Sequence, residues 1–452
     1  MALNRARLLT IAFFISGAVG LALWTNPSDA ATADNWPHWR GPDNNGADED
    51  ADLPLSWSET ENILWKVAIP GQGSASPIVW GEKIFVQTAI SAPAVAPAEP
   101  EAPAAGGRQR RRGPRGKTPS PTQFKMLALN LSDGSLIWEK TLLEKTPHEG
   151  THPTGTWASN SPVTDGENIY SYFGSNGIYC LDLDGNLKWQ KDLGDMRKRL
   201  GFGEGSSPAL YQDTLVLLWD HEDDSFIIAL DKRDGSEKWR TARDEITSWA
   251  SPLIVEYQGK AQVITGATNR VRSYDLETGA LLWEDSGLTL NPIPSPVHSD
   301  GIVYVTAGFR GSALRAIDLS KAKGEITGTD AILWSYDQDT PYVPTPLLYQ
   351  EALYIIKVNS PILTAIDVNS GQPYYARQRL ESLNTIYSSP IAAKDRLYIF
   401  DREGNALVIK HGQEFEVLGS NQLDDGFDAS PAIIGDTFLL RGHRNLYRIG
   451  KR

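Results

Sequence analysis

Few side chains in this 452-residue sequence have the type and spacing that catalysis requires. His148 and His152 stand four residues apart, as in a helical metal site, but Gly150 and Pro153 favour a loop there. The serines mostly begin strands and have no recurring histidine or aspartate nearby, so no nucleophilic triad is expected. Cys180 is the only cysteine, which excludes an intramolecular disulfide, and its alternating surroundings predict a buried, inert thiol. We therefore predict no catalytic residue and no metal ligand.

Binding is the chemistry that the remaining polar and aromatic loop residues favour. Arginines and aromatic rings that converge on one face could hold a carboxylate, a peptide chain or a flat ring. For each residue the alternative is that it only solvates its loop or stacks within it. The candidate ligand- or partner-binding residues are Arg270, Arg310, Arg402, Arg441, His221, His443, Trp157 and Trp249.

A repeat positions these loops. A Ser-Pro or Thr-Pro pair followed by an apolar strand occurs eight times, and after the first gap the spacing stays between 41 and 50 residues. Short strands separated by Gly and Asp turns predict four antiparallel strands in each unit. The pattern therefore predicts an all-β, eight-bladed β-propeller. The hydroxyl residues of the pairs are Ser76, Ser161, Ser207, Ser251, Ser295, Thr345, Ser389 and Ser430.

The outer strand of each unit carries a second signature. In most units a turn glycine, which supplies positive φ, is followed four residues later by an aromatic ring that could wedge between neighbouring sheets. The rings are Trp138, Trp189, Trp239, Trp283 and Tyr375, with Trp334 in the same role after a longer turn. The last unit lacks a fourth strand, and residues 62–69, with Trp65, are predicted to supply it. This N-terminal strand would close the ring and cover an exposed sheet edge.

Four ranges describe the predicted organisation. Residues 1–33 have a basic start, an apolar stretch and a small-residue cleavage site, which indicate an export signal, with an uncleaved anchor as the alternative. Residues 34–60 form a Trp-rich segment that we expect to dock on the propeller wall, and 61–450 form the propeller. An Ala/Pro/Arg-rich insertion at 91–122 is predicted to be disordered. Its basic run, 108–117, is interpreted as a solvated loop, with an anionic partner as the alternative.

Charge and export limit the class of partner. The net charge of −13 argues against a general affinity for nucleic acid. The export signal predicts a protein of the periplasm or cell envelope, in contact with a membrane only through that signal or through a partner. A protein or peptide of the envelope is therefore the expected partner.

The turn at residues 276–283, Leu-Glu-Thr-Gly-Ala-Leu-Leu-Trp, and the Ser-Pro strand starts resemble the PQQ-like (quinoprotein-type) propeller repeat family. The resemblance covers roughly residues 61–450 and is greatest to the BamB-like branch, which serves outer-membrane protein assembly. Residues 35–42 are similar to a segment of planctomycete-type exported propellers. The resemblance implies a non-catalytic envelope scaffold for outer-membrane protein assembly or another protein complex.

Two alternatives remain. The same family includes PQQ-dependent quinoprotein dehydrogenases, which use calcium and place a disulfide of adjacent cysteines over the quinone. Because Cys180 is alone, we expect no cofactor, and PQQ with calcium belongs only to this enzyme alternative. The other alternative is a polysaccharide-binding propeller, which would rely on the aromatic candidates Trp157 and Trp249.

Overall fold

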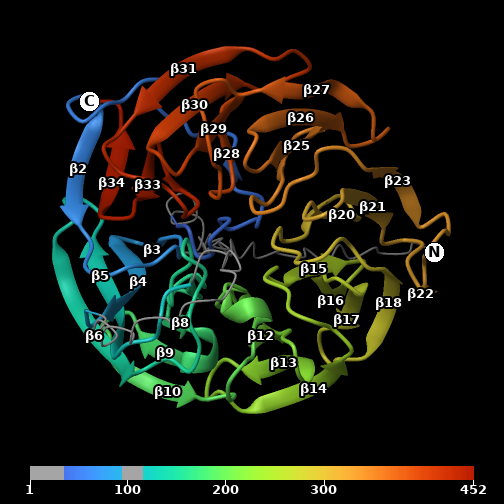
Figure 1. Ribbon diagram of the computed structural model, residues 1–452, viewed down its shortest axis with the longest axis horizontal. Helices are drawn as coiled ribbons and strands as arrows, with labels where there is room; N and C mark the ends of the chain where they lie inside the picture. The colour runs from blue at the N-terminus through green and yellow to red at the C-terminus, as the bar shows by residue number, and fades with distance from the viewer. Residues whose placement is uncertain (1–34, 94–115) are drawn as a thin grey trace, which may run out of the picture.

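Alternating apolar residues and tight turns make the described chain almost entirely β-strand. The computed structural model describes residues 35–93 and 116–452, which form eight β-sheets arranged as blades around a central channel (Figure 1). Six sheets have four strands, and two have a short fifth strand at one edge. The eight-bladed propeller predicted from the repeat is confirmed. No helix in these two ranges is long and apolar enough to span a membrane.

The blades follow one another along the chain. The first four consist of β3 (Ile78–Trp80), β4 (Lys83–Ser91), β5 (Thr122–Asn130) and β6 (Leu136–Lys145); β7 (Val163–Thr164), β8 (Asn168–Tyr172), β9 (Ile178–Asp182) and β10 (Leu187–Lys191); β11 (Ala209–Tyr211), β12 (Thr214–Trp219), β13 (Ser225–Asp231) and β14 (Glu237–Arg243); and β15 (Leu253–Tyr257), β16 (Lys260–Thr265), β17 (Arg270–Asp275) and β18 (Leu281–Ser286).

The next three blades consist of β19 (Val297–Ser299), β20 (Ile302–Ala307), β21 (Ala313–Asp318) and β23 (Ile332–Tyr336); β24 (Leu347–Tyr349), β25 (Ala352–Lys357), β26 (Ile362–Asp367) and β27 (Pro373–Arg379); and β28 (Ile391–Ala393), β29 (Arg396–Phe400), β30 (Asn405–Lys410) and β31 (Val417–Gln422). The additional edge strands are β1 (Ala47–Asp48), beside β28, and β22 (Gly324–Glu325), beside β18. Two 3-10 turns, η1 (Gly174–Asn176) and η2 (Arg199–Gly201), complete the set.

The eighth blade closes the ring with strands from both ends of the described chain. It consists of β32 (Ala432–Ile434), β33 (Thr437–Arg441), β34 (Asn445–Gly450) and β2 (Ile63–Ala68). In the antiparallel register between β2 and β34, Trp65 pairs with Arg448 and Val67 with Leu446, and the C-terminus lies beside β2 (Figure 1). The predicted closing strand is confirmed, and it leaves the eighth blade no open edge on that side.

The repeated tryptophans join each blade to the next. The indole N–H of Trp138 donates to the Leu183 carbonyl of the following blade at 3.1 Å, and the ring lies on the turn at Gly185. Gly185 has φ +84°, which favours glycine, and a Cβ there would lie only 2.9 Å from the Trp138 ring. The turn therefore requires glycine for its backbone conformation and for the close approach of the ring. Equivalent indole N–H bonds reach the next blade from Trp65, Trp189, Trp239 and Trp334.

Trp283 departs from this pattern. Its indole N–H donates to Gln262 Oε1, 3.1 Å away within its own blade. The following blade has a longer turn, whose strand β22 pairs with β18 beside Trp283. This longer connection occupies the place that a short glycine turn takes in the other blades.

The Ser/Thr-Pro pairs form a closed ring of hydrogen bonds, which we call the hydroxyl ring. The backbone N–H of each hydroxyl residue donates to the side-chain oxygen of the corresponding residue in the next blade, at 2.8 to 3.0 Å. The last bond, from Ser430 N–H to Ser76 Oγ, links the eighth blade to the first. The hydroxyl recurs in all eight repeats of this chain because it accepts a hydrogen bond from a buried backbone N–H that no strand partner reaches.

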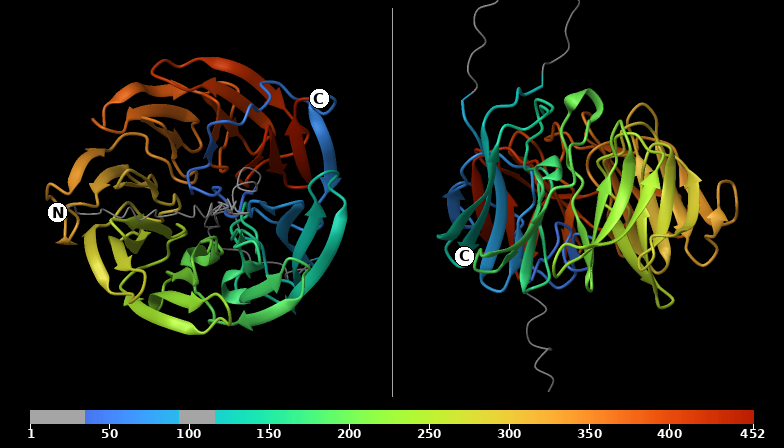
Figure 2. Two further views of the ribbon diagram at one scale, coloured as in Figure 1. Left: turned by 180° about the vertical axis from the view of Figure 1, so that it is seen from behind. Right: turned by 90° about the horizontal axis from the view of Figure 1, so that it is seen from below.

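The N-terminal plug, residues 36–45, closes one end of the channel. Trp36 pairs with Val79, and buried Arg40 donates to the carbonyls of Pro390 at 2.7 Å and Asn45 at 2.5 Å. From behind, this blue segment lies near the centre of the ring (Figure 2, left). Docking of residues 34–60 on the propeller wall stays a prediction for the range as a whole, while within the plug Trp36 contacts the inner strand β3 through Val79.

The predicted disordered insertion is shorter where the structure describes it. β4 extends to Ser91, and β5 begins at Thr122. Lys117 and Thr151 exchange two backbone hydrogen bonds, in each of which the N–H of one residue donates to the carbonyl of the other. These backbone bonds hold the flanks of the insertion to the first blade and to the connection that follows it. Residues 94–115, and the predicted export signal at 1–33, lie outside the described residues.

Candidate binding site

A blind pocket occupies the central channel. Its volume is about 290 Å³. It opens on the face that carries the loops between the second and third strands, which we call the mouth face, and the plug closes its other end with Trp39. In the side view, the green loops around residue 200 rise from one face and the blue N-terminal segment lies toward the other (Figure 2, right). Beyond the hydroxyl ring, the wall includes Trp39, His152, Phe202, Glu204, Trp249, Tyr342, Tyr387 and Asp428.

Contacts behind its ring hold Trp249 in place on the pocket wall. Its indole N–H donates to the Gly203 carbonyl at 2.8 Å, and the Lys198 ammonium lies 5.3 Å from the ring centroid. Lys198 is itself buried and donates to the carbonyls of Asp220 and Ser248. Burial lowers the Lys198 pKa to about 8. One face of the indole is thus fixed by a cation, and the ring is rigid.

The other aromatic rings of the wall are also braced. Tyr342 stacks on Phe309 with centroids 4.8 Å apart and an interplanar angle of 26°. The Arg402 guanidinium lies 4.6 Å from the Tyr387 ring centroid. Phe202 meets His152 edge to face at 4.9 Å. Such contacts reduce ring motion and present preformed flat surfaces to the cavity.

Two acidic side chains belong to the wall, Glu204 from the loop before β11 and Asp428 from the loop before β32. Glu204 accepts hydrogen bonds from the Ser175 N–H at 2.7 Å and the Ser175 hydroxyl at 2.6 Å, and burial raises the Glu204 pKa. Asp428 accepts from Arg402 at 2.5 Å and from His443 at 3.0 Å. Burial alone would raise the Asp428 pKa, but these two partners hold it below its usual value. The charge of Asp428 is therefore compensated.

A lysine from the basic run also reaches the pocket mouth. Lys117 Nζ donates to Gln72 Oε1 at 2.9 Å and to the Gly155 carbonyl at 2.7 Å. Burial lowers its pKa, and the charges of Asp428 and Arg402 act on it as well. The described end of the insertion is thus fixed beside the mouth.

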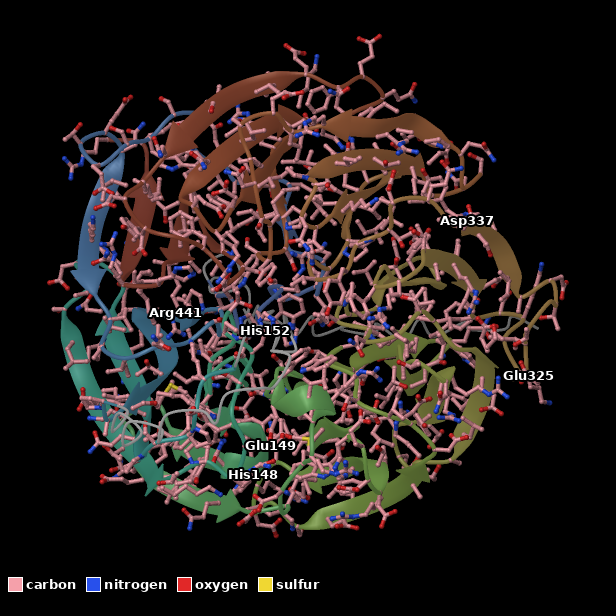
Figure 3. The ribbon with its side chains drawn as sticks, in the orientation of Figure 1. His148, Glu149, His152, Glu325, Asp337 and Arg441 are labelled. Carbon is pink, nitrogen blue, oxygen red and sulfur yellow. The ribbon has the colours of Figure 1, made fainter. Side chains whose placement is uncertain are left out.

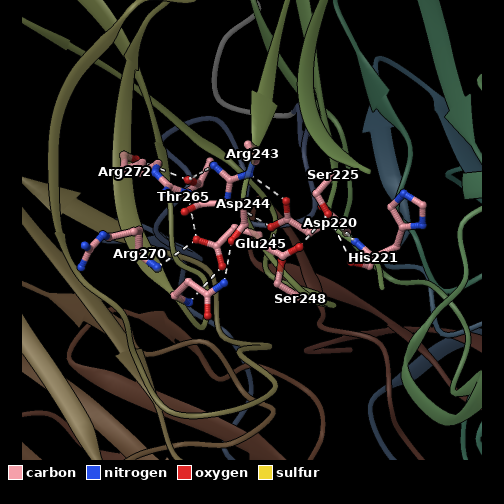
Figure 4. A network of polar contacts seen from close by, with 12 residues as sticks. Asp220, His221, Ser225, Arg243, Asp244, Glu245, Ser248, Thr265, Arg270 and Arg272 are labelled. Carbon is pink, nitrogen blue, oxygen red and sulfur yellow. Dashed lines mark hydrogen bonds and ion pairs between the residues drawn. The ribbon is translucent and has the colours of Figure 1, made fainter. Parts of the chain in front are cut away.

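A buried ionic network supports the mouth face between the third and fourth blades (Figure 4). Arg243 Nε donates to Asp220 Oδ1 at 2.7 Å, with both side chains almost fully buried. Arg272 Nη1 donates to Glu245 Oε1 at 2.9 Å, and Glu245 also accepts the backbone N–H of Arg270 at 2.9 Å. Removing one partner of such a pair leaves a buried charge, so the network fixes the loops that carry it.

Four of the predicted binding residues lie away from the pocket. His221 is buried, and its Nδ1 accepts the Arg197 N–H at 3.1 Å. The Arg270 guanidinium lies 3.8 Å from Glu284 on the outer part of the mouth face. Arg441 is buried and donates to the carbonyls of Ala75 and Gln87, apart from His152 in Figure 3. Trp157 is absent from the pocket wall and donates to the Glu149 carbonyl at 3.1 Å.

The other four lie at or near the pocket. Trp249 is part of the wall, and Arg402 and His443 reach it through Asp428. Arg310 is exposed on the rim, 5.3 Å from the centroid of Phe309. A binding role for all eight remains a prediction.

Sequence reasoning missed the hydroxyl ring and several wall residues. The repeated hydroxyl before proline was a detectable signal, because a strand start alone does not require Ser or Thr. Trp39, Phe202, Glu204 and Asp428 carry no repeat signal and come from irregular segments.

The histidines considered for metal binding lie apart (Figure 3). His148 Nδ1 is 3.3 Å from Asp195, whereas His152 Nδ1 is 2.7 Å from Thr154 Oγ1. Within residues 35–93 and 116–452, no group of three or more His, Cys, Asp or Glu could hold a metal ion. Cys180 is buried, and burial raises its pKa to about 12.

Comparison with known proteins identifies relatives of this fold. The family model described as outer membrane protein assembly factor BamB matches residues 122–291 and 267–415. No curated protein matches the chain in sequence. The structure of BamB from Moraxella catarrhalis has a TM-score of 0.53 and 13% identity, covering 72% of this chain and 91% of that one.

Two enzymes share the architecture. A europium-containing methanol dehydrogenase has a TM-score of 0.59 and 9% identity, covering 92% of this chain and 98% of that one. Quinohemoprotein alcohol dehydrogenase from Comamonas testosteroni has a TM-score of 0.59 and 10% identity, covering 94% and 82%. At these identities the likeness shows the fold alone.

The fold family raises the question of a quinone cofactor with calcium. Calcium takes six to eight oxygen ligands, usually including several carboxylates. The acids on the described wall are Glu204 and Asp428, which are engaged by Ser175 and by Arg402 and His443 respectively. These residues do not fit a calcium-bound quinone.

Proposed function

This chain belongs to the family of the outer membrane protein assembly factor BamB, and we propose that it is a non-catalytic binding scaffold of the cell envelope. A protein partner docks on its mouth face. The observation that carries this proposal is the asymmetry of the channel: the plug closes one end, so the mouth face alone gives access to the pocket.

The rim of the mouth presents side chains that protein interfaces favour. Leu200 is 79% exposed and has φ +55° within η2, so the backbone holds an apolar side chain in solvent at a conformational cost. Exposed Arg310, with φ +52°, lies against Phe309. Arginine and aromatic residues are enriched at interfaces, and strain concentrates at functional sites. A partner that covers this rim would bury the exposed leucine.

Site-specific photocrosslinking tests the proposal. A photoreactive residue at position 310 is expected to capture a defined partner in intact envelopes. The same residue at position 260, the exposed first residue of β16 beside the turn from β15 on the opposite face, is the control. With the probe at position 310, the substitution Leu200→Ala should reduce capture, whereas Lys260→Glu should leave it unchanged. Equal capture from both faces would contradict the proposed docking face.

Export is the second part of the proposal. It is supported by the predicted signal at 1–33 and by the relationship to BamB. Fractionation of cells that express the full chain should place the protein in the envelope or periplasmic fraction. Recovery in the cytoplasmic fraction would contradict an envelope role.

A further inference from the structure

The hydroxyl ring leaves unused hydrogen-bonding capacity on the pocket wall. A hydroxyl group has one donor and two acceptor lone pairs. Each of the eight side-chain oxygens accepts one backbone N–H, and all eight residues line the pocket. None of these hydroxyls donates a hydrogen bond to another group among residues 35–93 and 116–452. The ring therefore offers a belt of groups that can each both donate and accept.

Flat aromatic surfaces adjoin this belt. Trp249, Tyr342 and Tyr387 lie on the same wall, and each is braced from behind by Lys198, Phe309 or Arg402. Trp39 contributes to the closed end. A ligand with an apolar ring face and polar edges could stack on an aromatic surface while its edges reach the hydroxyls.

The polar groups of the wall argue against three other ligand classes. An apolar ligand would expel water from eight hydroxyls without replacing its hydrogen bonds, which is costly. An anion would face the carboxyl group of Glu204, whose hydrogen bonds come from Ser175. A cation would find Asp428 already paired with Arg402 and His443, and Lys198 close behind Trp249.

We propose that the pocket binds a neutral polyhydroxylated ring, such as a monosaccharide or the terminal sugar of a glycan. Sugar hydroxyls both donate and accept, as the hydroxyl ring does, and the carboxyl oxygens of Glu204 can accept from neighbouring sugar hydroxyls. The volume of about 290 Å³ lies at the small end of ligand pockets, about 300–1,000 Å³, and the plug blocks passage of a longer chain. This inference concerns the channel and goes beyond the protein partner proposed for the rim.

Calorimetric titration of the full chain tests the ligand class. The sugar probes are glucose, galactose, N-acetylglucosamine and myo-inositol. Benzoate, tetramethylammonium and cyclohexanol serve as an anion, a cation and a largely apolar ring of similar size. At least one sugar probe should bind saturably, with the three other compounds bound more weakly. No saturable binding of any sugar probe up to tens of millimolar, or tighter binding of one of the other compounds, would overturn the proposal.

Two matched pairs of variants locate the bound sugar. Trp249→Ala should weaken its binding about tenfold or more, whereas Trp157→Ala, in the loop that leads into the second blade but off the pocket wall, should leave it unchanged. Ser251→Ala should weaken binding several-fold, and Ser251→Thr should retain it because Thr345 already serves in the ring. Equal affinity of Trp249→Ala and wild type would overturn the pocket assignment. Since crosslinking from position 310 does not depend on sugar, the two proposals fail separately.

Discussion

Removing one hydroxyl from the ring should weaken the propeller locally. In the wild type, the Ser161 N–H donates to Ser207 Oγ at 2.8 Å, and both residues are buried. Ser207→Ala removes that acceptor and leaves the Ser161 N–H without a protein partner. Ser207→Thr keeps an oxygen on the same carbon, and Thr345 shows that threonine accepts such a bond in this ring.

The expected cost follows from the burial of the orphaned donor. A buried donor without a partner costs about 1–3 kcal/mol. The donor lies on the wall of a cavity that opens to solvent, so a water molecule can partly replace the lost oxygen, and we expect about 1–2 kcal/mol. This free energy corresponds to a roughly 5- to 30-fold change in an opening equilibrium.

Native-state hydrogen exchange is the assay that resolves this change. A chain of 452 residues has a large unfolding entropy, so 2 kcal/mol would shift the melting temperature by only about 2 °C. Exchange of the Ser161 amide should instead accelerate 5- to 30-fold in Ser207→Ala and stay near wild type in Ser207→Thr. If Ser161 exchanges equally in the alanine and threonine variants, the ring does not stabilise the inner strands as argued.

Three further predictions concern the joints between blades, the ring closure and the plug. Gly235→Ala places a Cβ 2.7 Å from the tryptophan ring of the preceding blade. It should lower the free energy of unfolding in urea by about 1–3 kcal/mol more than the control Gly259→Ala, because Gly259 has a similar φ but open space around it. Equal losses in the two variants would contradict the role of the tryptophan in joining the blades. Deletion of residues 61–69 should lower thermal stability through the eighth blade, and unchanged unfolding would defeat the closure. Burial lowers the His38 pKa from 6.5 to about 3, so the stability that neutral His38 contributes is fully present above pH 6.5 and is lost as pH falls toward 3. At pH 5 the plug should be less stable by about 1–2 kcal/mol, and its backbone amides should exchange faster. In His38→Asn this pH dependence should disappear.

The repeat in the sequence was sufficient to predict the blades and their closure. A Ser/Thr-Pro pair, a glycine turn and an outer-strand tryptophan recur with nearly constant spacing, so eight copies constrain one architecture. Even here the pattern did not show that Trp283 would bond within its own blade. That outcome depends on where the longer turn before Trp334 folds, which is a contact between blades.

The sequence also showed which polar and aromatic side chains recur, but not which of them would face the pocket. Alternation and turn residues act over a few positions and therefore specify strands, blades and their loops. The pocket brings together Trp39, Phe202, Trp249, Tyr342 and Asp428, which are far apart along the chain and lie in irregular segments. Arg441 of the eighth blade is buried against the first blade, whereas Arg310 is exposed. This difference depends on which blade packs against each residue. Local pattern thus determined the ring, and only tertiary packing decided which end of its channel is closed and which side chains face the cavity.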